Sequence, residues 1–242
     1  MKNKLIFALT FLIAVVIVRK LMLKYFIDIS PIIVAVAFLL IQRDKFSLFN
    51  FKLFKPSSFL AIIIITYILL FLTIIILTHF KLAEFSKPDN GILFYVLIPI
   101  IAGLTEETAW RGYLFSKLKE LTWLQITIII NLIWSIWHIP THYHSLEGHF
   151  WISFPLFIAS CFEIGIIMQY LRVKTDSVIP CILFHALFIV PLMLAGLKTR
   201  VLYLGSFPTI IMILLLLPLT IYCYIVGKRL HDAKKQVIPI TA

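Results

Sequence analysis

The sequence is short of charge, and above all of negative charge. Only 14% of its 242 residues are charged, and 11 Asp and Glu stand against 22 Lys and Arg. With 62% hydrophobic residues and a mean hydropathy of +1.04, this composition excludes an ordinary soluble globular domain. We therefore expect a polytopic membrane protein.

Cysteine is scarce as well, with Cys161, Cys181 and Cys223 all inside apolar runs. Their odd number and lack of metal-ligand spacing argue against a disulfide framework. The net charge of +11 does not indicate nucleic acid, because the basic residues gather in short segments between apolar runs. That distribution is typical of contact with anionic lipid, so the expected partner is the lipid bilayer and not nucleic acid.

Internal repeats and low-complexity linkers are missing, which favours one membrane-embedded domain over residues 1–242. Several apolar runs are long enough to cross, or nearly cross, a hydrocarbon core that needs about 20 helical residues. They do not alternate with the period of two of barrel strands, so we predict helices. The fold class is an all-α polytopic membrane protein, a bundle of about eight transmembrane helices, with runs at 5–18, 26–41, 58–78, 91–112, 121–139, 150–170, 177–195 and 201–226. For the two short first runs, the alternative is a tilted hairpin.

The basic residues between the runs predict the orientation. If the N-terminus is inside the cell, the inner segments, Arg172 among them, hold twice as many Lys and Arg as the outer ones. The N-terminal segment resembles a signal peptide but lacks a small-residue cleavage site and ends in Arg19 and Lys20, which we count as outer residues. We interpret it as a retained first span, and we expect both termini in the cytoplasm.

The fourth run ends in GLTEETAWRG, with three charged residues within six positions. Charged side chains are rare inside a bilayer unless they pair, face a wet cavity or take part in chemistry. Glu107 and Arg111 are four residues apart, in the order that favours an ion pair on a helix. Glu106 is rotated by about 100° from Glu107 and points elsewhere. We expect Arg111 to neutralise Glu107 and leave Glu106 as a general base for water, with purely structural pairing as the alternative.

A histidine in the next run is placed to meet this glutamate. If the intervening chain forms two helices joined by a turn near Thr122, Glu106 and His138 are equally far from that turn and lie at similar depth. Asn131, Trp134 and His138 would then form one stripe on the fifth helix.

A second histidine, His185, lies near the middle of the seventh run. Together, Glu106, His138 and His185 supply one carboxylate and two imidazoles from three helices. Such a set can hold zinc or another divalent metal with an open position for water, or can bind the water directly. Either arrangement predicts hydrolysis, although a single histidine in an apolar helix is more often a packing residue.

Other polar residues receive structural interpretations. We interpret Glu163, alone in the sixth run, as a partner in interhelical pairing. Pro140 is expected to end or kink the fifth helix, which breaks the face that a metalloprotease HExxH motif requires. His142, His144 and His149 are therefore assigned to an outer loop.

The order EETAWRG, then WSIWH, then HALFI resembles the CAAX protease and bacteriocin-processing family of intramembrane proteases. The pattern of that family is EExxxR, then FxxxH, then HxxxN or HxxxD. The motifs cover residues 106–189, within a family-like core of about 91–195. The resemblance implies a helical membrane protein that cleaves peptides within or beside the bilayer. We expect it in a bacterial plasma membrane.

The resemblance also implies roles for single residues. Glu106 would be the water-activating base, and His138 and His185 would bind the water or a metal. Glu107 and Arg111 carry over as supporting members of the first motif, which agrees with the ion pair expected from their spacing.

Two positions depart from the family pattern. Trp134 stands where Phe is usual, which we interpret as a mild aromatic exchange, and Ile189 stands where Asn or Asp is expected. Asn131 is no simple substitute, because it lies about 10 Å along the helix from His138.

The leading hypothesis is an intramembrane endopeptidase for membrane-associated or secreted peptide precursors. The missing polar group at Ile189 favours an alternative, a catalytically impaired family member that acts in membrane regulation or bacteriocin immunity. A transporter would also place charges in the membrane, but the absence of internal repeats argues against it.

Overall fold

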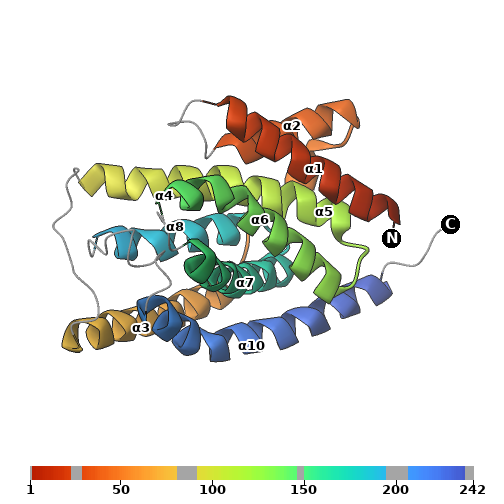
Figure 1. The fold of residues 1–242 in the computed structure, drawn as a ribbon. Helices are drawn as coiled ribbons and strands as arrows, with labels where there is room; N and C mark the ends of the chain where they lie inside the picture. Colours follow the sequence, from red (N-terminus) through yellow and green to blue (C-terminus); the bar gives the residue numbers. More distant parts are fainter. Residues whose placement is uncertain (1, 23–28, 81–91, 146–149, 195–206, 238–242) are drawn as a thin grey trace.

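The computed structural model describes residues 2–22, 29–80, 92–145, 150–194 and 207–237, and these segments form a bundle of helices without strands (Figure 1). Each predicted apolar run contains one main helix, which confirms the predicted fold class. The main helices are α1 (Lys2–Leu21), α2 (Ser30–Ile41), α3 (Pro56–His79), α4 (Ile92–Glu107), α6 (Trp123–Ser145), α7 (Phe150–Thr175), α8 (Ile179–Leu194) and α10 (Phe207–Val237). Three short segments, η2 (Phe46–Phe49), η3 (Thr108–Leu114) and α5 (Phe115–Leu118), complete the described chain.

Five of the described helical segments are long and apolar enough to cross a membrane. α2 and α8 are shorter apolar helices, and α1 has the length of a span but carries basic residues at both ends. The protein is therefore an integral membrane protein. The five segments are Phe59–His79, Leu93–Leu118, Trp123–Pro140, Phe154–Thr175 and Thr209–Gln236.

The outside of the bundle is apolar and its inside holds the polar groups. Along α3, Ile64, Ile68, Phe71 and Ile75 recur at helical spacing and are all exposed. In water such a stripe would be unfavourable, but in a bilayer it faces lipid. The ionisable residues of the predicted site are instead turned inward, as expected where charge is excluded from hydrocarbon.

Close packing of α4 on α8 brings two of the predicted motifs together. A Cβ atom at Gly103 of α4 would lie 2.8 Å from the backbone oxygen of Ile182 in α8 and 3.5 Å from Cβ of His185. Only glycine leaves room for this approach, so its absence of a side chain sets the distance between the two helices.

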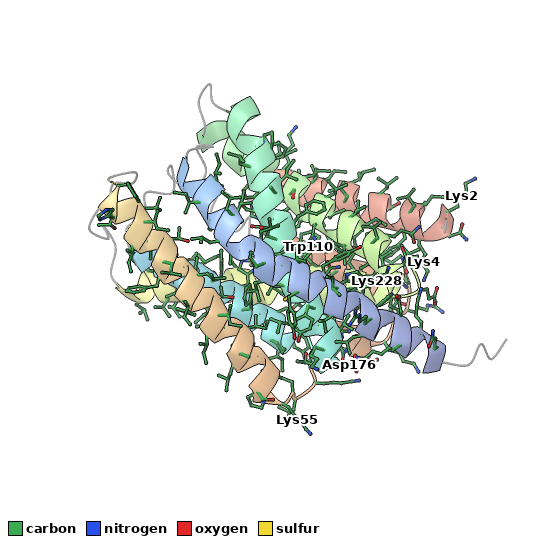
Figure 2. The ribbon with its side chains drawn as sticks, turned by 90° about the horizontal axis from the view of Figure 1, so that it is seen from below. Lys2, Lys4, Lys55, Trp110, Asp176 and Lys228 are labelled. Carbon is green, nitrogen blue, oxygen red and sulfur yellow. The ribbon has the colours of Figure 1, made fainter. Side chains whose placement is uncertain are left out.

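The described ends of the chain lie at one end of the bundle. Lys4 of α1 pairs with the Glu120 carboxylate at 3.2 Å, and Lys235 of α10 donates to the Glu120 backbone oxygen at 2.5 Å. Figure 2 shows Lys2, Lys4, Lys55 and Lys228 along this side of the molecule, which we call the basic end.

The excess of inner Lys and Arg predicts that the basic end faces the cytoplasm. A reporter that is active only outside the cytoplasm should therefore be silent when fused to the C-terminus. The same reporter fused after Phe80, beyond the opposite end of α3, should be active. The reverse pattern of activity in intact cells would contradict this orientation.

Two arginines counted as loop residues are buried in helices instead. Arg19 belongs to α1, where its Nη1 donates to the backbone oxygen of Trp137 and its guanidinium lies 4.6 Å from the Trp137 ring. Arg172 belongs to α7 and is 5% exposed. The prediction was wrong for both because buried backbone oxygens accept their hydrogen bonds, as the Arg111 oxygen does from Arg172 Nε at 3.0 Å.

Pro140 does not end α6, which continues to Ser145. The assignment of His142 and His144 to a loop is therefore wrong, since both lie in the last turns of this helix, while His149 falls outside the described residues. Proline removes one hydrogen bond and strains the preceding turn, but it need not stop a helix whose freed carbonyls find other donors. The carbonyl that Pro140 frees is that of Ile136, four residues back, and Arg19 donates to the adjacent backbone oxygen of Trp137.

α1 and α2 pack against each other as separate helices. Phe38 of α2 makes edge-on ring contacts with Phe7 and Phe11 of α1, at centroid distances of 5.7 Å and 5.3 Å. Phe11 also contacts the rings of Trp110 and Tyr113 in η3, so this pair of helices covers the motif segment.

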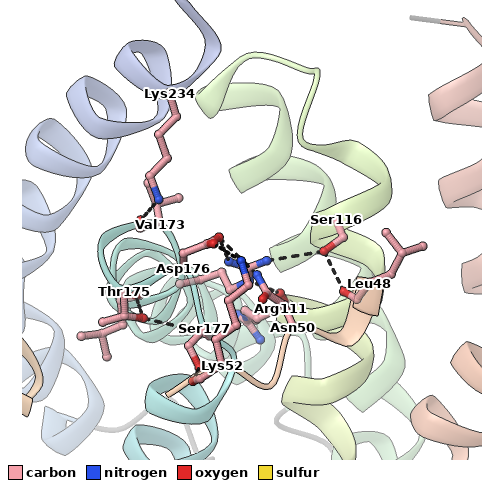
Figure 3. A network of polar contacts seen from close by, with 12 residues as sticks. Leu48, Asn50, Lys52, Arg111, Ser116, Val173, Thr175, Asp176, Ser177 and Lys234 are labelled. Carbon is pink, nitrogen blue, oxygen red and sulfur yellow. Dashed lines mark hydrogen bonds and ion pairs between the residues drawn. The ribbon is translucent and has the colours of Figure 1, made fainter. Parts of the chain in front are cut away.

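α7 ends at the basic end in a network of hydrogen bonds around Asp176. Asp176 takes a left-handed φ of 51°, which stops the helix, and accepts hydrogen bonds from Lys52 Nζ at 2.7 Å and Arg172 Nη1 at 3.2 Å. Figure 3 shows this network joining α7 to the segment that follows η2. Burial raises the pKa of Asp176, but the hydrogen bond from Lys52 and the charge of Arg172 outweigh it and lower the pKa to about 2.

This lowered pKa predicts an acid-dependent loss of stability. The contribution of ionised Asp176 is complete above its ordinary pKa of 3.8 and is lost as the pH falls toward about 2. Asp176→Asn lacks the contribution at every pH. The difference in unfolding temperature between wild type and this variant should therefore shrink between about pH 4 and pH 2. A difference that is constant over this range would refute the assignment.

Candidate active site

The first motif lies at the centre of the bundle, where α4 passes into the π-helical segment η3. All seven residues of η3 are buried. π-helical turns are rare and occur mostly at functional sites. A Cβ atom at Gly112 would lie 3.0 Å from the Phe49 backbone oxygen, so glycine lets η2 close over this segment. The sequence EETAWRG is thus enclosed by protein rather than exposed to lipid.

The predicted ion pair between Glu107 and Arg111 is confirmed. Arg111 Nη1 lies 3.1 Å from Glu107 Oε2, and both side chains are completely buried. Arg111 Nη2 also donates to Asn131 Oδ1 at 3.0 Å, and its guanidinium lies 4.7 Å from the Trp134 ring. A buried charge pair requires such additional partners, because desolvation offsets much of its Coulomb energy.

His185 is a direct partner of Glu107 rather than of Glu106. Its Nδ1 lies 2.8 Å from Glu107 Oε1. An ionised carboxylate can only accept hydrogen bonds, so Nδ1 carries a hydrogen and donates a hydrogen bond to Glu107. This bond fixes the orientation of the imidazole ring. Glu107 therefore has two tasks that the sequence did not separate: it neutralises Arg111 and it orients His185.

Glu106 meets the stripe on α6, as predicted. α5 ends at Leu118 and α6 begins at Trp123, so the turn lies where it was expected. The Nε2 atom of His138 lies 3.8 Å from Glu106 Oε2. This distance confirms that Glu106 and His138 share one depth in the bundle, and it exceeds that of a direct hydrogen bond.

The interpretation of Trp134 as a mild exchange for Phe is incomplete. Its indole Nε1 donates a hydrogen bond of 2.7 Å to Glu106 Oε2, which a phenylalanine has no group to make. Its ring also lies between the two histidines, with centroids 5.7 Å from His138 and 5.9 Å from His185. Trp134 thus connects two carboxylate and histidine pairs into one cluster.

The cluster does not present three converging metal ligands. Within the described residues, no group of three or more His, Cys, Asp or Glu is placed to hold a metal ion. Glu107 engages Nδ1 of His185, and Trp134 engages Oε2 of Glu106. Zinc or another divalent metal held by Glu106, His138 and His185 stays a prediction, and no chemical step is assigned to it.

Ile189 places an apolar side chain one helical turn after His185. It is partly buried and packs against the hydrophobic core. The polar group of the family pattern is therefore replaced by packing at this position.

Two residues of α7 support the site and were missed in the sequence. A Cβ atom at Gly165 would lie 2.0 Å from Asn131 Oδ1 and 2.8 Å from Arg111 Nη2, so glycine makes room for their hydrogen bond. Arg172 holds the Arg111 backbone from the next turns of the same helix. The two lie seven residues apart and share a helix face, which is the only signal by which the sequence could have revealed them.

Glu163 pairs with no other helix among the described residues, contrary to the prediction. In the part of the chain that the structure describes, both of its carboxylate oxygens are buried without a hydrogen-bond partner. The rotation of α7 explains this, since Glu163 precedes Gly165 by two residues and is turned about 200° away from Asn131 and Arg111.

Comparison with known proteins bears on the same segment. Residues 88–190 match the family model of the type II CAAX prenyl endopeptidases, described as Rce1-like, and this range contains all six predicted site residues. A curated relative, the CAAX prenyl protease 2 of Methanococcus maripaludis, is 26% identical over 159 residues. That alignment covers 58% of this chain and 57% of the relative. Over the segment that holds its three motifs, which the structure joins in one buried cluster, the chain is similar to the type II CAAX prenyl endopeptidases.

Proposed function

We propose that the protein is a membrane-embedded endopeptidase in which Glu106 activates water. The observation that carries this proposal is the position of Glu106, which is 3% exposed inside a membrane-crossing segment and lies between Trp134 and His138. An ionisable residue at such depth is costly, so a catalytic task explains its presence better than packing does. The match to a family of endopeptidases supports the same reaction.

The proposed reaction needs one water and no covalent intermediate. Glu106 takes a proton from the water while the water oxygen attacks the peptide carbonyl, and His138 orients the attacking oxygen. Glu106 then gives the proton to the leaving amine as the carbon–nitrogen bond breaks. His185, held by Glu107, supplies the second imidazole beside the reacting groups. The products are a carboxylic acid and an amine, and the acid then gives its proton to the amine or to water.

The proposed substrates are peptides or proteins held at the membrane, including lipid-anchored precursors. The buried position of the site supports this class, and the names of the matching family and relative point to prenylated chains. The alternative, a regulatory or immunity protein without activity, rests on Ile189 alone. The cluster of Glu106, His138, His185 and Trp134 has no evident use in that alternative.

The activity is tested with purified protein in lipid vesicles. The panel pairs a peptide carrying a C-terminal prenyl group with the same peptide without it, and adds membrane-anchored peptide precursors. We expect cleavage of at least one membrane-held peptide and slower cleavage of its soluble counterpart. Folded protein that cleaves nothing in the panel would favour the regulatory alternative.

Ile189→Asn is expected to speed this cleavage. The oxyanion formed by attack on the carbonyl needs donors, and one donor typically contributes about 10² to 10³ in rate. Residue 189 lies one turn after His185 on the same helix face, so an amide there can reach the same region. The measurement is the rate of peptide cleavage per folded protein.

The control for this prediction is Ile189→Leu, which keeps the apolar character and should leave the rate unchanged. A gain in Ile189→Asn that survives in combination with Glu106→Gln would refute Glu106 as the base. If Ile189→Asn only lowers stability, by about 1 to 3 kcal/mol for an unsatisfied buried amide, position 189 does not face the reacting groups.

A further inference from the structure

A cavity of about 880 Å³ lies at the basic end, away from the candidate active site. Its walls come from α5, the last turns of α7 and the last turns of α10. The volume falls within the range of about 300 to 1,000 Å³ found for small-molecule sites. We call it the basic cavity, because Lys119, Arg172, Lys234 and Lys235 line it against only Glu120 and Asp176.

Both acidic residues of the cavity already have cationic partners. Glu120 pairs with Lys4 at 3.2 Å, and Asp176 pairs with Lys52 at 2.7 Å, neither lysine being part of the lining. Arg172 adds a second ion pair with Asp176. The cavity therefore keeps an excess of positive charge on its lysines.

These lysines contact neutral groups. Lys234 Nζ donates to the Val173 backbone oxygen at 2.6 Å, as Figure 3 shows, and Lys235 Nζ donates to the Leu121 backbone oxygen at 2.9 Å. Within the described residues no hydrogen bond or ion pair is found for the Lys119 side chain. Three ammonium groups around one cavity thus have no carboxylate of their own, which favours an anionic ligand.

The remaining wall is apolar, with Phe115 and Leu230 among its residues. The cavity also lies where the membrane-crossing segments end, at Leu118, Thr175 and Gln236. Lipid headgroups occupy this depth. We propose that the basic cavity binds the phosphate group of an anionic phospholipid, with the start of an acyl chain against the apolar wall. Basic pockets between transmembrane helices bind such headgroups on the cytoplasmic side.

A bound lipid would stabilise the segment that carries the first motif. Arg172 contributes to the cavity wall and donates through Nε to the Arg111 backbone oxygen at 3.0 Å. A ligand that binds only the folded state raises its stability. Lipid binding is therefore expected to raise the unfolding temperature, whether or not the protein cleaves peptides.

The test uses the full chain, delipidated in a neutral detergent, and follows thermal unfolding during titration. Phosphatidylglycerol should raise the unfolding temperature, whereas phosphatidylcholine and free glycerol phosphate at the same concentrations should not. Lys119→Gln and Lys235→Gln should each weaken the apparent affinity for phosphatidylglycerol about five-fold. The matched controls Lys55→Gln and Lys228→Gln remove a charge at the same end outside the lining and should leave the affinity unchanged.

Each contrary result overturns the proposal. An equal response to phosphatidylcholine would show a general lipid effect, and an equal response to glycerol phosphate would show a soluble phosphate ligand. Equal weakening in the two control variants would show diffuse surface attraction. Lys235→Gln could lower the unfolding temperature even without lipid, because Lys235 donates to backbone oxygens. In that case the lipid affinity of Lys119→Gln tests the proposal, because the Lys119 side chain makes no described contact that supports the fold.

Discussion

Glu106→Gln is expected to abolish peptide cleavage while the amount of folded protein stays close to that of wild type. Glutamine keeps the shape of the side chain and an oxygen that can accept the hydrogen bond from Trp134. An amide cannot take a proton from water, and losing a general base costs about 10² to 10⁴ in rate. The measurement is the initial cleavage rate, divided by the amount of monodisperse protein after extraction from the membrane.

The matched control for this prediction is Glu120→Gln, which removes a glutamate at the basic end, outside the candidate site, where it pairs with Lys4. It should retain the wild-type rate. A rate for Glu106→Gln within a few-fold of wild type would show that another group activates the water.

Glu107→Gln and Arg111→Gln are each expected to reduce the amount of folded protein sharply. Removing one member of a completely buried pair leaves the other charge without compensation, at about 3 to 5 kcal/mol. This is a large part of the 5 to 15 kcal/mol that stabilises a typical protein. Glu107→Gln also weakens the contact that orients His185. The measurement is the fraction of expressed protein that remains monodisperse and unfolds cooperatively.

The double variant Glu107→Gln with Arg111→Gln separates charge from packing. It leaves no unpaired charge, so it should retain more folded protein than either single variant. Equal losses in Glu106→Gln, Glu107→Gln and Arg111→Gln would contradict the division between a catalytic and a structural glutamate.

The sequence was sufficient for contacts that depend on local geometry. Glu107 and Arg111 follow from the spacing of one helical turn. The proximity of Glu106 and His138 follows from their equal distance in sequence from the turn between two helices. In any tight helical hairpin, residues equally far from the turn lie side by side. The helical class and the membrane spans follow from hydropathy alone.

Contacts between distant helices were not predictable in the same way. The pairing of His185 with Glu107 depends on how α8 is rotated against α4, which the close approach at Gly103 sets. The space for the Arg111 network depends on Gly165, a residue that nothing in its local sequence distinguishes. The motif likewise did not reveal the hydrogen bond of Trp134, because the family pattern has phenylalanine at this position, which has no group to donate.

The buried arginines show a limit of predicting orientation by counting Lys and Arg between the apolar runs. Arg19 and Arg172 raise the count of loop residues, yet both lie inside helices and donate to backbone oxygens. Such residues contribute to the fold rather than to orientation. The predicted orientation does not depend on them, because each side of the membrane loses one basic residue when they are omitted.

The central claim is that Glu106 makes this protein a peptidase, and one comparison tests it most directly. Cells that carry wild type or Glu106→Gln, matched for the amount of folded protein, are compared for the peptides that they release and retain in the membrane. The account predicts cleaved peptides with new termini in wild-type cells that are absent with Glu106→Gln. Identical sets of peptides in the two cells would contradict it.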